Sequence, residues 1–104
     1  MKTFPLHPYR FILHVTDSTE EMQQVYTALG GKGQHDWQAG AVFCHKNKVF
    51  LGVFDGKLGT LVHEASHAAL DVANRVGYDP TGEQEPFAYL LEHIFIKARQ
   101  KLGL

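Results

Sequence analysis

Two long amphipathic helical patterns fill the C-terminal part of the chain and limit how it can fold. The first spans roughly Thr60 to Val76 and stops at Gly77, a residue that favours the end of a helix. A polar turn at 79–82 leads to a second pattern that runs to about Leu102. Each pattern has one apolar face, formed by Leu61, Ala65, Ala69, Val72 and Val76 in the first and by Phe87, Leu90, Leu91, Ile94, Phe95, Ala98 and Leu102 in the second. Both faces must be buried against other elements of the same domain.

The N-terminal half supplies the strands that these helices cover. Apolar and polar residues alternate over Tyr9–Val15, which predicts a strand. A helix follows, because Ser18 and Glu21 form a capping-box pattern and Gly30 ends the apolar periodicity. The two β-rich runs 41–46 and 49–54 predict a hairpin around Asn47-Lys48.

The predicted order is therefore β-α-β-β-α-α. It indicates an α+β fold in which three helices pack on a short antiparallel or mixed sheet of about three strands. A chain of 104 residues suits a single domain over 1–104.

Charge and composition narrow the classes of function. The 10 basic and 11 acidic residues leave a net charge of −1, which argues against nucleic acid as a partner. The apolar runs are too short for a membrane span, and residues 1–10 contain no secretory h-region. The single cysteine, Cys44, fits a reducing compartment. We therefore expect a cytoplasmic protein with neither a membrane nor a nucleic-acid partner.

The first helical pattern carries the residues best suited to chemistry, His63-Glu64-Ala65-Ser66-His67. Histidines at positions i and i+4 lie one above the other on a helix, so both rings can reach one Zn²⁺ ion. The intervening Glu64 lies beside such an ion and can act as a general base toward a metal-activated water. This is the H-E-x-x-H pattern of metalloproteases.

A catalytic zinc site needs a third protein ligand. The metzincin pattern is excluded, because this chain has Leu70 and Ala73 where that class has glycine and histidine. The second helical pattern offers candidates on its polar face, which include Glu85 and His93, and Glu83 lies on the preceding turn. If the two helices pack by their apolar faces, the edges of their polar faces are expected to meet.

Two segments of the chain resemble the minigluzincins, which are very small phage- and prophage-encoded metallopeptidases. They are Leu-Val-His-Glu-Ala-Ser-His-Ala at 61–68 and Glu-Pro-Phe-Ala-Tyr-Leu at 85–90. The resemblance implies a zincin-like minimal core with His63, His67 and Glu85 as zinc ligands and Glu64 as the general base. It also implies a peptide held along an edge strand. Pro86 replaces the alanine usual after the ligand glutamate, so we expect the last helix to start close to Glu85.

Three further residues are candidates for support of the site. Asp71 lies four residues after His67 and is placed to accept the second ring N–H of that histidine. Tyr89 and His93, on the second helical pattern, are candidates to stabilise the transition state. For each of them a plain structural role is the alternative.

The sequence therefore predicts a zinc-dependent peptidase that acts on peptides or proteins, with Glu64 as base. The alternative is a catalytically inactive zinc-binding structural or interaction module, associated with phage. A third alternative is a surface helix that binds no metal. The oligomeric state and the cleavage specificity do not follow from the sequence.

Overall fold

The computed structural model describes all residues from Met1 to Leu104. The elements in chain order are β1 (Lys2–Leu6), β2 (Phe11–Thr16), α1 (Thr19–Ala28), β3 (Gly40–His45), β4 (Lys48–Val53), α2 (Leu58–Val76) and α3 (Gln84–Leu102). The α+β prediction is confirmed, with one four-stranded mixed sheet and three helices.

Strand β1 is the element that sequence reasoning missed. Pro5 and His7 interrupt the apolar alternation there, and proline cannot donate to a sheet. The strand is nevertheless possible because β1 lies at the edge and pairs only with β2, in antiparallel register. The observed order is β-β-α-β-β-α-α rather than β-α-β-β-α-α.

The sheet order is β1-β2-β4-β3, which makes β3 the other edge strand. Strands β2 and β4 are parallel, with Ile12 opposite Lys48, and β3 and β4 form an antiparallel hairpin. The hairpin turn falls on Lys46 and Asn47, one residue before the predicted position. Lys46 adopts a positive φ of 55°, as tight hairpin turns require.

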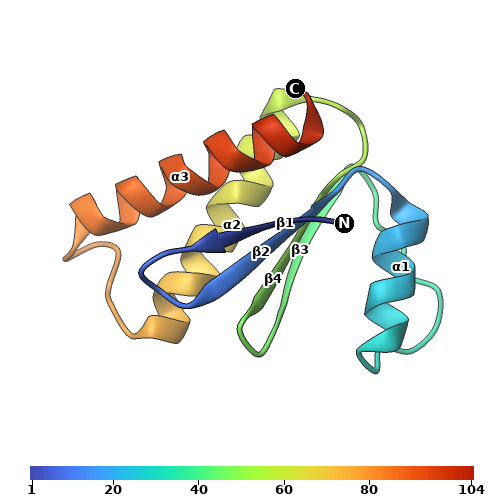
Figure 1. The fold of residues 1–104 in the computed structure, drawn as a ribbon, viewed down its shortest axis with the longest axis horizontal. Coiled ribbons are helices and arrows are strands. Elements are labelled where there is room, and N and C mark those ends of the chain that lie inside the picture. Colours follow the sequence, from blue (N-terminus) through green and yellow to red (C-terminus); the bar gives the residue numbers. More distant parts are fainter.

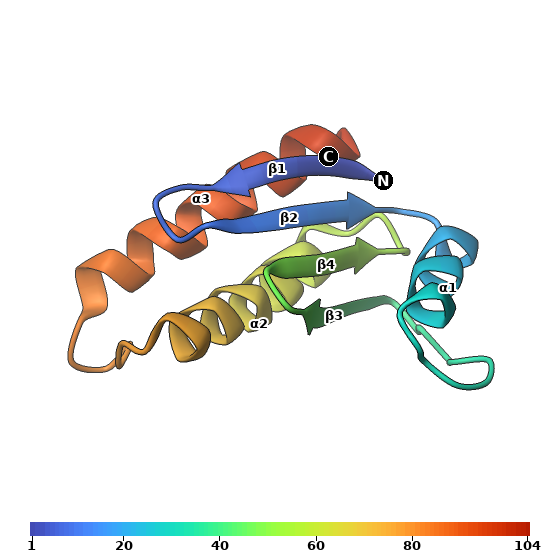
Figure 2. The same cartoon turned by 60° about the horizontal axis from the view of Figure 1, so that its bottom comes forward.

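Helices α2 and α3 cover one face of the sheet (Figures 1 and 2). Helix α2 contacts β3 and β4, whereas α3 contacts β1 and β2. The main core between these layers is built around fully buried residues from strands and helices alike, among them Leu13, Leu51, Leu61 and Ile94. The apolar face predicted for 87–102 is confirmed, because all of its residues belong to this core or pack against it.

Helix α1 lies beyond the ends of β2 and β4 (Figure 2) and closes a smaller cluster of Met22, Trp37 and Phe50. Its predicted capping box is half formed. The Glu21 N–H donates to Ser18 Oγ at 3.1 Å, but the Glu21 carboxylate accepts from the N-terminal amine at 3.0 Å instead of from the Ser18 backbone. None of the three helices combines the length and the hydropathy of a membrane span.

His14 in β2 predicts an acid sensitivity. Its ring centroid lies 4.7 Å from that of Phe50, and its Nε2 atom is buried without a hydrogen-bond partner. Burial, assisted by Lys48 and the N-terminal amine, lowers the pKa of His14 below 6.5. Below that pH the unfolded chain binds more protons than the folded protein, so stability falls with falling pH, by at most about 1.4 kcal/mol per pH unit.

We expect His14→Phe, which keeps a ring against Phe50, to lose less stability between about pH 7 and about pH 5.5 than the wild type. Urea unfolding at both pH values measures the loss. Equal losses in the two proteins would assign the acid sensitivity to other groups.

Candidate metal centre

Both ends of α2 are held in place, which fixes where the helix begins and ends. Before the helix, Asp55 accepts from the Lys57 N–H at 3.0 Å and from the Thr60 hydroxyl at 2.7 Å. At the other end Gly77 adopts the left-handed conformation, with φ +87°, and its N–H donates to the Ala73 carbonyl. The buried side chains of α2 face the sheet and α3, which leaves His63 and His67 exposed.

The two histidines meet as the sequence predicts. Their Nε2 atoms lie 3.2 Å apart, with ring centroids 4.8 Å apart. Two nitrogens bound to one tetrahedral zinc ion at about 2.0–2.1 Å would lie about 3.3 Å apart, so the pair already has the spacing of two zinc ligands. His63, Glu64 and His67 each offer a ligand atom, and these atoms all lie within 4.8 Å of one another.

Glu64 differs from the histidines in its surroundings. Its side chain is only 7% exposed, and burial raises the pKa of its carboxyl, an effect that His63 and His67 oppose. A cavity of about 350 Å³ opens beside it, with walls from residues 38–40 and from the first turns of α2. The sequence alone did not assign residues 38–40 to the site. The available signal was Gly40 at the start of a strand, since glycine there often marks a close approach of two backbones.

The free edge of β3 lies beside this group. The Phe54 N–H donates to the Ala39 carbonyl at 2.8 Å, which makes Ala39 and Phe54 a hydrogen-bonded pair. Because such pairs alternate along an antiparallel ladder, the N–H and C=O groups of Gly40, Val42 and Cys44 point away from β4. Unpaired main-chain groups therefore run along the side of α2 that carries Glu64.

Asp71 lies on the same side of α2 as Glu64, and its side chain contacts strand β3. The Cys44 thiol donates to an Asp71 carboxylate oxygen at 3.6 Å. Burial and the nearby Asp71 raise the pKa of Cys44 to about 11, so this thiol is a poor nucleophile at neutral pH. A hydrogen bond from His67 to Asp71 stays a prediction.

The structure does not bring Glu85 to the histidines. Glu85 is exposed in the first turn of α3, as predicted from Pro86, and it is not a member of the metal-ligating group. From His67 to Val76 helix α2 rises ~13 Å, and the chain then passes through the loop 77–83 before α3 begins. Glu85 therefore starts far along the helix pair from His67, and its role as third ligand stays a prediction.

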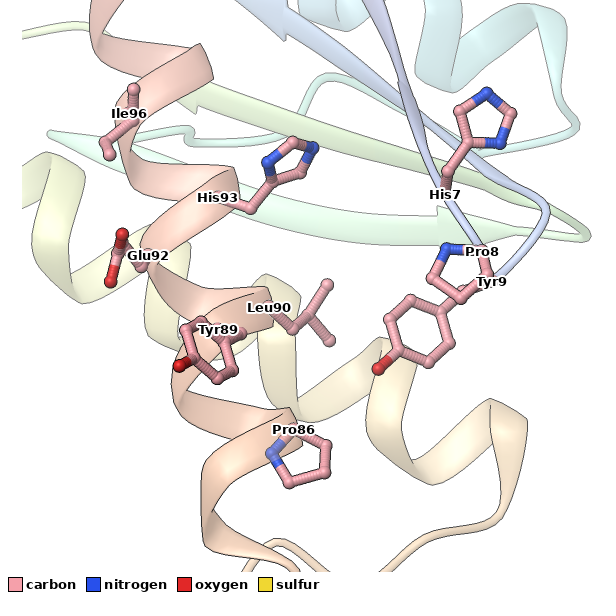
Figure 3. Close-up of a pocket in the computed structure, with 9 residues that line it drawn as sticks. All are labelled: His7, Pro8, Tyr9, Pro86, Tyr89, Leu90, Glu92, His93 and Ile96. Carbon is pink, nitrogen blue, oxygen red and sulfur yellow. The ribbon is translucent and has the colours of Figure 1, made fainter.

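Tyr89 and His93 lie away from the group formed by His63, Glu64 and His67. They line a cavity of about 400 Å³ between α3 and the β1–β2 turn, which contributes Tyr9 (Figure 3). The ring of His93 packs against Phe4 of β1, with centroids 4.9 Å apart. The expected meeting of polar helix edges does not occur, because α3 lies over β1 and β2 whereas the histidine pair lies on the side of α2 toward β3.

Comparison of the chain with models of protein families, with curated proteins and with solved structures finds no match in any of the three.

Proposed function

We propose that this protein is a zinc-dependent peptidase whose centre is formed by His63, Glu64 and His67. One observation carries the proposal. Two imidazole nitrogens lie 3.2 Å apart on a helix, with a buried carboxylate between them in the sequence and an unpaired strand edge alongside. Zinc accepts imidazole nitrogen readily, and a carboxylate next to it in a partly buried position suits proton transfer.

Each side chain of the group has a distinct task. His63 and His67 would hold the metal, since their Nε2 atoms lie 3.2 Å apart. A bound zinc ion would supply Lewis acidity toward a carbonyl and toward water. Glu64 accepts the proton of the attacking water and delivers it to the leaving amine. Burial raises the pKa of Glu64, which makes its carboxylate a stronger base. A stronger base removes a proton from water more readily.

A peptide is the substrate that fits the surroundings of the centre. The main-chain groups of Gly40, Val42 and Cys44 are free to pair with an extended chain, as in other strand-addition complexes. A peptide paired along β3 would run past Glu64, whose Cγ packs against Gly40. Main-chain pairing of this kind selects for peptides and is largely indifferent to their sequence.

A third ligand would complete the centre. The resemblance to minigluzincins favours Glu85, with Glu83 and His93 as alternatives. Helix α2 rises ~13 Å from His67 to its last residue, so Glu85 would have to shift by a comparable distance along α2 to join the histidines.

One observation favours a second function. His63 and His67 are both exposed, and α2 alone provides only these two imidazoles. An exposed pair of this kind also suits a zinc-binding interaction module without catalysis, in which another molecule completes the metal site. Zinc binding without hydrolysis would favour this alternative.

The test uses zinc-loaded protein and a pool of synthetic peptides with mass-spectrometric detection of cleavage. We expect cleavage that stops when a chelator removes the zinc and returns when zinc is added back. Cleavage that persists in metal-free protein would contradict the proposal. Zinc-loaded Glu64→Gln protein, purified in the same way, controls for contaminating peptidases.

A further inference from the structure

Gly40 packs directly on the side chain of Glu64. A Cβ atom at position 40 would lie 2.9 Å from Glu64 Cγ, 2.8 Å from Thr60 Cγ2 and 2.9 Å from the Gly52 carbonyl oxygen. Carbon atoms in ordinary contact are about 3.5–4.0 Å apart. No side chain at position 40 is therefore compatible with the observed position of Glu64.

This constraint concerns space and not backbone conformation. Gly40 is not among the residues with positive φ, so an alanine there carries no intrinsic backbone strain. The missing side chain instead lets strand β3 approach helix α2 closely, with the stem of Glu64 between them. The carboxylate is thereby directed into the cavity that it shares with His63.

The geometry points to Gly40 as a positioning residue for Glu64, an inference that rests on the proposed function. A methyl group at position 40 would displace the stem of Glu64 and with it the carboxylate. A displacement of about 1 Å at a catalytic group lowers turnover by roughly 100-fold. None of the three atoms nearest to a Cβ at position 40 belongs to a histidine, so we expect metal binding to be retained after such a change.

The chain offers a matched control in Gly82. It lies in the loop 77–83, outside the cavity of Glu64, and a Cβ atom there would come no closer than 3.6 Å to the nearest atom. With the peptides that the zinc-loaded wild type cleaves, we expect Gly40→Ala to lower kcat by roughly 10–100-fold and Gly82→Ala to leave kcat nearly unchanged. Both variants should bind zinc as the wild type does, as a competing chelator measures. Equal kcat values in the two variants would overturn the inference and leave the proposed function intact.

A second measurement is independent of activity. Alanine at position 64 has no Cγ atom, so it removes one of the three close contacts with a methyl group at position 40. We expect Gly40→Ala to lower the urea midpoint less in the Glu64→Ala background than in the wild type, which is the signature of direct contact in a double-mutant cycle. A Gly40→Ala protein that folds only in the Glu64→Ala background gives the same answer. Equal losses in both backgrounds, or failure to fold in both, would assign the constraint to Gly52 and Thr60 and overturn the inference. If the zinc-loaded wild type cleaves no peptide, the proposed function fails instead, and the catalytic role of Gly40 fails with it.

Discussion

Replacement of Glu64 by glutamine is expected to lower peptide hydrolysis by about 10²–10⁴-fold while zinc stays bound. Glutamine has the size of glutamate and fills the same buried space, but it cannot accept a proton from water. The two histidines proposed to hold the metal are unchanged. Initial rates of peptide cleavage and zinc content, measured on the same sample, test both halves of the expectation.

Stability provides the control for this variant. Burial raises the pKa of Glu64. Above the ordinary carboxyl pKa the folded protein therefore binds more protons than the unfolded chain, and its free energy of unfolding falls as the pH rises. The neutral glutamine removes this loss, so metal-free Glu64→Gln should be at least as stable as the wild type near neutral pH.

Glu92 is an exposed carboxylate of α3, and Glu92→Gln should leave hydrolysis unchanged. Hydrolysis that survives Glu64→Gln would exclude Glu64 as the base.

The second large effect concerns the metal. We expect His67→Ala to lower zinc affinity by more than about 100-fold, because loss of a mere outer-shell partner already costs about 10–100-fold. The Nε2 atoms of His63 and His67 lie 3.2 Å apart, and both residues belong to the one group of three His, Cys, Asp or Glu side chains with ligand spacing. Competition with a chromophoric chelator measures the affinity. His45→Ala, at the hairpin end of β3, is the matched control and should leave the affinity unchanged.

The same titration decides the third ligand. A loss in Glu85→Ala comparable to that in His67→Ala would show that the start of α3 reaches the metal. An unchanged affinity in Glu85→Ala would exclude it and direct attention to Glu83→Ala and His93→Ala. Wild-type affinity in His67→Ala itself would contradict the metal centre as a whole.

Much of the fold was predictable, because the relevant signals are local. The apolar face of 87–102 and the stop at Gly77 depend on neighbours within one or two helical turns, and both are confirmed. Strand β1 was not predictable in this way. Its Pro5 opposes strand formation locally, and only the edge position beside β2 makes that residue acceptable.

The same distinction applies to the candidate metal centre. The sequence alone determined that His63 and His67 meet, because residues four apart on a helix are neighbours whatever the helix packs against. Only the tertiary structure decided that β3 is a free edge beside the two histidines and that Gly40 packs closely on the side chain of Glu64. It likewise placed His93 against Phe4 of β1 and Tyr89 in the cavity beside the β1–β2 turn. The direction in which α3 crosses the sheet depends on packing between distant segments, which the spacing of residues along the chain does not reveal.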